Sequence, residues 1–141
     1  MASHILVPVD ESDHAERAFE FALEKFPDAQ MTVLHVIDPA ERWAFPDPRK
    51  FPSQDEFDRA IEEAAEFLEE YVDRAKAEGV DATAAHELGK PIHEIIAYAD
   101  ENDVDGIVMG SHGRSGPSRI LLGSVAEAVT RRASVPVTIV R

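Results

Sequence analysis

Residues 104–125 read VDGIVMGSHGRSGPSRILLGSV, a stretch that leaves a short apolar run, crosses a glycine-rich loop and enters a helical pattern. The run that ends at Gly110 is nearly continuously apolar, which is typical of a parallel strand buried on both faces. Gly123 and Ser124 then open a helix expected over residues 124–133. The stretch therefore predicts a strand–loop–helix unit of the kind that builds α/β folds.

Similar apolar runs elsewhere supply the remaining strands. Residues 4–10, 31–38 and 135–140 are nearly continuous apolar segments, whereas residues 80–88 alternate and should lie nearer an edge of the sheet. With residues 104–110 these segments make five strands.

Helical patterns separate these strands. Apolar spacings of three and four predict a first helix that ends by Pro27, and Ser53 begins a second, with capping-box spacing, that Gly79 terminates. Pro91 suits the first position of a third helix, and the fourth follows the glycine-rich loop. Because strands and helices alternate, we predict a Rossmann-like, doubly wound α/β sandwich with a five-stranded parallel sheet and about four helices, forming one domain over residues 1–141.

The segment of residues 38–52 breaks this alternation. It holds four prolines together with Trp43, Phe45 and Phe51, and we predict that it has no regular structure. Two interpretations stay open, a lid or contact loop beside a strand end and an aromatic-anchored surface loop.

The charge balance is strongly acidic. Asp plus Glu number 28 against 14 Lys plus Arg, which gives a formal net charge of -14. Such a field disfavours nucleic acid and anionic membranes as partners, because both bind clustered positive charge. A solvated acidic surface beside a normal apolar content of 44% favours a halophilic source with a salt-rich cytoplasm.

The absence of cysteine excludes disulfides, thiolate metal sites and cysteine nucleophiles. The first residues, Met-Ala-Ser-His, run straight into an apolar segment without a basic leader, and no run is long enough to span a bilayer. We therefore predict a cytoplasmic protein.

The glycine-rich loop has the ingredients of a phosphate site. Glycines at a strand exit let backbone amides approach a ligand, and Gly123-Ser124 adds a hydroxyl and the positive end of a helix dipole. In a doubly wound sheet the binding crevice lies where the strand order reverses, so Asp10 is expected to face Gly110 there.

Standard phosphate-binding signatures are absent. Gly89-Lys90 is followed by Pro91, and no G-x-G-x-x-G follows the first strand. From the residues alone, a nucleotide site and a plain turn are about equally supported.

The loop spacing resembles a known family motif. Gly110-x-x-Gly113, nine residues and Gly123-Ser124 match the G-2x-G-9x-G-[ST] motif of the ATP-binding branch of the universal stress protein family. The resemblance covers the whole chain. Its further landmarks are Val7-Pro8-Val9-Asp10, His35-Val36-Ile37-Asp38, Gly89-Lys90-Pro91 and Val135-Pro136-Val137.

This resemblance implies nucleotide contacts from the strand ends and the glycine-rich loop. It places at the adenosine end Pro8, Val9, Asp10 and the backbone of Val36, over the ribose Met109 and Gly110, and around the phosphates Gly113, Arg114, Gly123, Ser124, Val125 and Ala126. Ala126 departs from the pattern, because some ATP-binding members carry Ser or Thr there. ATP, ADP and AMP therefore stay open as ligands, as does a divalent ion such as Mg²⁺.

Ser111 and His112 lie within the same loop. His112 is a candidate phosphate contact, with a solvent-facing side chain as the alternative. A nucleophile and base pair is disfavoured, since adjacent residues rarely face each other and no orienting carboxylate is evident.

The remaining histidines suggest no metal site. His14, His86 and His93 share no ligand spacing, so we predict no zinc site, and His35 is expected to be a strand core residue.

Three functions follow in order. The first is an adenine-nucleotide-binding stress-response or signalling module that is not a fast enzyme and meets an unknown protein partner. The second is a slow ATPase or self-phosphorylating protein, for which only Asp10, Asp13 and Arg114 are candidate groups. The third is a nucleotide-free interaction protein. The family resemblance also implies a homodimer formed through the strand of residues 135–140.

Overall fold

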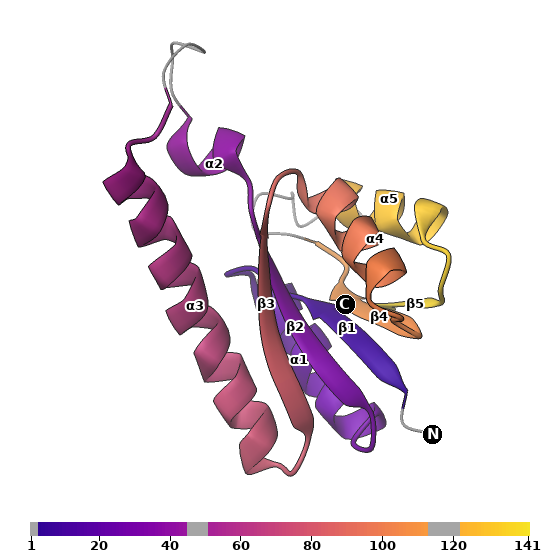
Figure 1. Cartoon of the computed structure of the whole chain (residues 1–141). Coiled ribbons are helices and arrows are strands. Elements are labelled where there is room, and N and C mark those ends of the chain that lie inside the picture. The colour runs from indigo at the N-terminus through magenta and orange to yellow at the C-terminus, as the bar shows by residue number, and fades with distance from the viewer. Residues whose placement is uncertain (1–2, 45–50, 113–121) are drawn as a thin grey trace.

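A five-stranded parallel sheet forms the centre of the computed structural model, which describes residues 3–44, 51–112 and 122–141 (Figure 1). The strands are β1 His4–Pro8, β2 Gln30–Ile37, β3 Asp81–Leu88, β4 Gly106–Gly110 and β5 Val137–Val140. They lie in the order β3-β2-β1-β4-β5, and all neighbours pair in parallel. The chain moves outward from β1 in one direction and then in the other, so the sheet is doubly wound as predicted.

Two layers of helices cover the sheet. The helices in the described part of the chain are α1 Asp13–Lys25, α2 Pro39–Trp43, α3 Gln54–Ala77, α4 Pro91–Glu101 and α5 Ser124–Arg132. α1 and α3 pack on one face, and α4 and α5 pack together on the other (Figure 1). This arrangement is the predicted Rossmann-like sandwich.

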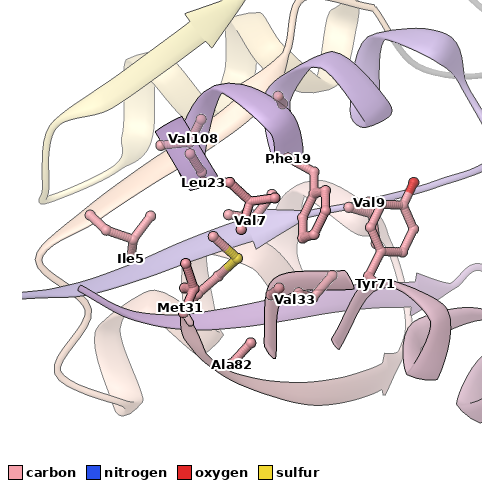
Figure 2. Close-up of a cluster of buried hydrophobic side chains, with 14 of the residues drawn as sticks. Ile5, Val7, Val9, Phe19, Leu23, Met31, Val33, Tyr71, Ala82 and Val108 are labelled. Atoms are coloured by element: carbon pink, nitrogen blue, oxygen red, sulfur yellow. The ribbon is translucent and has the colours of Figure 1, made fainter. Parts of the chain in front are cut away.

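Each face of the sheet has its own apolar core. Successive residues of a strand point to opposite faces, so Val7 enters the core under α1 and α3 while Leu6 enters the core under α4 and α5. In the first core the rings of Phe19 and Tyr71 meet edge to face, with centroids 4.8 Å apart, close to Val9 (Figure 2). Burial on both faces is the reason that the strands read as continuous apolar runs.

The predicted helix boundaries agree with the structure. The Ser53 hydroxyl accepts a hydrogen bond from the Glu56 amide at 3.2 Å, as the capping-box spacing indicates. Gly79, with φ of 78°, ends the same helix in the left-handed region that favours glycine. β3 lies at an edge of the sheet, which confirms the interpretation of its alternating sequence.

The prediction that residues 38–52 lack regular structure is wrong for Pro39–Trp43, which form α2. The Asp38 carboxylate accepts a hydrogen bond from the Ala40 amide at 3.0 Å and caps this short helix. Pro39 occupies the first turn, where its missing N–H leaves no hydrogen bond unmade. Residues 45–50 lie outside the described residues.

Two side-chain contacts attach α2 to α3. The Trp43 and Phe57 rings stack with centroids 6.1 Å apart and planes 10° from parallel. Arg42 Nη2 lies 2.7 Å from Glu63 Oε2. α2 therefore lies beside the N-terminal half of α3, beyond the carboxyl ends of the strands (Figure 1).

Candidate functional site

A cavity of about 250 Å³ opens at the carboxyl ends of β1, β2 and β4. The strand order reverses between β1 and β4, and this reversal is where ligands bind in open α/β sheets. α2 and α3 wall the cavity on one side, and the first turns of α4 and α5 wall it on the other. One compartment thus receives residues from every part of the fold.

Most of the predicted site residues lie on this cavity. Those that line it are Pro8, Val9, Asp10, Val36, Met109, Gly110, His112, Val125 and Ala126. Gly123 and Ser124 are not among the lining residues, although they precede two that are. Gly113 and Arg114 lie outside the described residues.

Asp10 is held by the turn that starts α1. Its Oδ1 accepts hydrogen bonds from the Ser12 amide, at 2.9 Å, and from the Ser12 hydroxyl. The same hydroxyl accepts from the Ala15 amide at 3.1 Å and caps the helix. The orientation of the Asp10 carboxylate at the cavity is therefore fixed by the first turn of α1.

Gly110 is needed for close packing between β4 and α1. A Cβ atom at this position would lie 2.7 Å from both the carbonyl carbon and the Cβ of His14. The resemblance places Gly110 over the ribose, but the structure shows a second reason for glycine, the approach of α1 to the strand end. This approach brings Asp10 and Gly110 to one cavity, as predicted.

The first turn of α5 presents unused backbone donors at the cavity. The Gly123 amide donates to the Ser111 carbonyl at 2.6 Å, which ties the start of the helix to the end of β4. Glu127 makes the first intrahelical bond, to the Gly123 carbonyl, and no side chain caps the helix. The amides of the first turn, from Ser124 onward, thus have no acceptor within the helix, and the positive end of its dipole lies beside the cavity.

Ser111 and His112 do face each other, so the expectation that these neighbours would point apart is wrong. The Ser111 hydroxyl and His112 Nδ1 are 3.0 Å apart, and the residues are 1% and 9% exposed. β4 ends at Gly110, so the alternation that separates neighbouring side chains no longer applies to this pair. The His112 ring packs on that of His14, with centroids 5.0 Å apart, and does not face solvent.

Several residues of the cavity were not identified from the sequence. His35 lines it and is only half-buried, with Nδ1 2.9 Å from the Val9 carbonyl oxygen and its ring against Phe67. α3 adds Ala60 and Ala64. The helical spacing of the α3 residues was visible in the sequence, but no local pattern says that this part of the helix extends over a strand end.

Two searches of the described residues complete the site. Residues 3–44, 51–112 and 122–141 contain no group of three or more His, Asp or Glu side chains placed to hold a metal ion. Within the same ranges, none of the helices combines the length and the apolar character that crossing a bilayer requires.

Known proteins resemble this chain along its whole length. The profile of the universal stress protein family matches residues 1–141. Universal stress protein YxiE of Bacillus subtilis is 34% identical over 150 residues, covering 100% of both chains.

Solved structures resemble it equally fully. The structure of protein MJ0577 of Methanocaldococcus jannaschii superposes with a TM-score of 0.81 at 32% identity, covering 99% of this chain and 96% of the other. An Archaeoglobus fulgidus universal stress protein in complex with dAMP has a TM-score of 0.69 at 27% identity, covering 100% and 98%. A universal stress protein in complex with cAMP has a TM-score of 0.72 at 27% identity, covering 99% and 97%.

The family match spans the chain from end to end, and the doubly wound sheet with its cavity at the strand reversal has the same overall architecture as those solved relatives. The chain belongs to the universal stress protein family.

Proposed function

We propose that the cavity binds an adenine nucleotide and that the chain works as a nucleotide-binding stress-response or signalling module, with one binding domain over residues 1–141. The observation that carries this proposal is the uncapped start of α5, whose residues Val125 and Ala126 line the same cavity as Asp10 and Val36. Backbone amides at a helix N-terminus are natural phosphate ligands, and the strand ends across the cavity offer polar groups to a base. Relatives solved with dAMP and cAMP support an adenine ligand.

In this proposal the two ends of the cavity have different tasks. Asp10 and the Val36 backbone contact the adenine, and Met109 with Gly110 covers the ribose. The first turn of α5 and the loop that contains Gly113 and Arg114 hold the phosphates, with His112 as a further contact. Because the phosphates meet mainly neutral backbone amides, they are bound without regard to the base.

The physiological ligand is ATP, ADP or AMP, with or without Mg²⁺. Ala126 is buried at the cavity and carries no hydroxyl that reaches a terminal phosphate or its metal ion. Comparing the affinities of the three nucleotides, each with and without added magnesium, distinguishes these cases.

Calorimetric titration of the purified protein with ATP and GTP tests the proposal. We expect tighter binding of ATP, loss of ATP binding in Gly123→Val, and a loss of about 1 kcal/mol in Ser124→Ala, which removes one hydrogen bond. Gly123 has φ of -67° and ψ of 159°, a conformation open to valine, so the larger side chain acts on the ligand and not through backbone strain.

Ser134→Ala is the matched control for Ser124→Ala, because the Ser134 hydroxyl bonds Asp100, a residue that does not line the cavity. The proposal fails if the folded wild type binds no adenine nucleotide, or if Gly123→Val folds and binds unchanged.

A second candidate function is slow ATP hydrolysis or self-phosphorylation. The hydrogen-bonded pair of Ser111 and His112 beside the cavity is the observation that favours it. Release of phosphate by stringently purified protein that is abolished by His112→Gln would support turnover, and equal release by both proteins would assign it to a contaminant.

We further propose that the protein is a cytoplasmic homodimer in a salt-rich cell. β5 is the last strand at one edge of the sheet, and its four residues are half-buried, so its open side offers a pairing edge to a second copy. A sedimentation experiment at micromolar concentration in high salt should show a dimer, and a clean monomer would contradict this assembly.

A further inference from the structure

The hydrogen-bonded ladder between β1 and β2 stops just short of the cavity. Their paired residues end at Pro8 and Leu34, and the Val9 amide still donates to the Leu34 carbonyl at 2.8 Å. In a parallel pair the backbone polar groups of alternate residues point to the same neighbour. Leu34 points to β1, so Val36 does as well, and the next bond of the ladder would run from the Val36 amide to the Val9 carbonyl.

The side chain of His35 takes that carbonyl instead. Its Nδ1 lies 2.9 Å from the Val9 oxygen, and because a carbonyl only accepts, Nδ1 carries the proton. The Phe67 ring from α3 packs against the imidazole, with centroids 5.2 Å apart and planes at 66°. The ring is thus braced in the position that holds Val9.

Val36 lies where the two strands part. It lines the cavity, and among the described residues no backbone bond joins its amide to Val9. Its N–H and C=O therefore point toward the cavity beyond the end of β1. A donor and an acceptor side by side match the acceptor N1 and the donor N6 of adenine, whereas guanine offers the opposite pattern at these positions.

We propose that His35 is a positioning residue that determines base specificity. By holding the Val9 carbonyl it ends the ladder one bond early and keeps the Val36 backbone available to read adenine. This inference rests on the proposed nucleotide function and adds to it the residue that selects the base.

Removing the imidazole should extend the ladder. In His35→Leu the Val9 carbonyl is free to accept the Val36 amide, which then no longer meets the base. We expect about a tenfold loss of ATP affinity, equivalent to about 1.4 kcal/mol, with GTP affinity unchanged. The ratio of ATP to GTP affinity falls by the same factor, whereas a general loosening of the fold would weaken both nucleotides together.

His35→Asn is the rescue variant, because the amide nitrogen of asparagine can take the place of Nδ1 and donate to the same carbonyl. His86→Leu is the matched control. His86 is the register partner of His35 on β3, but it is exposed and does not line the cavity.

The experiment combines calorimetry with ATP and GTP on these four proteins and hydrogen exchange of the Val36 amide. We expect fast exchange of this amide in the wild type, protection on adding ATP, and protection without nucleotide in His35→Leu. The inference is overturned if His35→Leu keeps the wild-type ratio of affinities, or if His35→Asn loses that ratio as fully as leucine does. A wild type that binds neither nucleotide refutes the proposed function itself, and protection of Val36 without nucleotide in the wild type refutes the role of His35 alone.

Discussion

At the scale of single residues, two glycines of β4 differ in what surrounds them. A Cβ at Gly110 would meet the His14 backbone at 2.7 Å, whereas at Gly106 the nearest atoms would be Ile5 Cδ1 at 3.4 Å and the Pro136 carbonyl oxygen at 3.7 Å. We expect Gly110→Ala to lower the free energy of unfolding by about 1–3 kcal/mol, because α1 must move away from the strand. Gly106→Ala should change it by less than about 1 kcal/mol.

Urea denaturation of the two variants measures this difference. Equal stabilities would show that α1 yields without cost, and the packing role of Gly110 would be withdrawn.

Tyr71 predicts how stability responds to alkaline pH. Burial, with the Glu16 carboxylate beside it, raises the pKa of Tyr71 well above its usual value. Above about pH 10 the unfolded chain loses a proton that the folded protein keeps, so stability falls as the pH rises, by at most about 1.4 kcal/mol per pH unit. This contribution is fully present below about pH 10.

Tyr71→Phe has no proton to lose at this site. Its free energy of unfolding, measured by urea denaturation from about pH 9 to pH 11.5, should decline less steeply than that of the wild type. Parallel declines in the two proteins would mean that other groups cause the alkaline loss.

At the scale of elements, α2 depends on its contact with α3. Trp43 is the one tryptophan of the chain, and it stacks on Phe57. We expect Phe57→Ala to shift the Trp43 emission to longer wavelength, with a loss of stability of about 0.5–1.5 kcal/mol from the lost ring contact.

Glu63→Gln provides the comparison, because it breaks the ion pair with Arg42 and leaves the ring stack in place. That pair is half-exposed and worth little, so its emission should stay close to that of the wild type. Unchanged emission in Phe57→Ala would show that other contacts hold α2.

The elements also show how far sequence reasoning extends. The strands, the four longer helices and the doubly wound order follow from periodicity and from caps such as Ser53, because these signals are local. α2 was missed because its prolines were taken as evidence against a helix, although Pro39 lies in the one turn that tolerates it.

The site divides in the same way. Asp10, Val36 and Met109 were identified because they lie at or just beyond strand ends, which meet at one edge of a parallel sheet. His35 was expected in the strand core, yet it is half-buried at the cavity, where it bonds the Val9 carbonyl. Its task depends on where β1 and β2 part, and that is a tertiary property with no local sequence signal.

At the scale of the whole molecule, charge governs the response to salt. The formal net charge is -14, and the like-charge repulsion that it creates is screened over about 10 Å in 0.1 M salt and about 3 Å in 1 M salt. We expect the melting temperature to rise from low to molar KCl, because repulsion weakens while burial of apolar surface does not. A flat or falling melting temperature in a thermal scan would contradict adaptation to a salt-rich cell.

The division of the core between two faces has a consequence for biosynthesis. All residues of the core under α1 and α3 except Val108 come from Ile5 to Ala82, so this face is nearly complete once β3 has left the ribosome. The opposite core needs α4, β4 and Val129 of α5, and until these emerge Leu6 and Leu34 lie on an uncovered face of the growing sheet. The nascent chain therefore carries a half-finished sheet whose bare side is the natural target for a chaperone, and translation of the last third of the message ends that exposure.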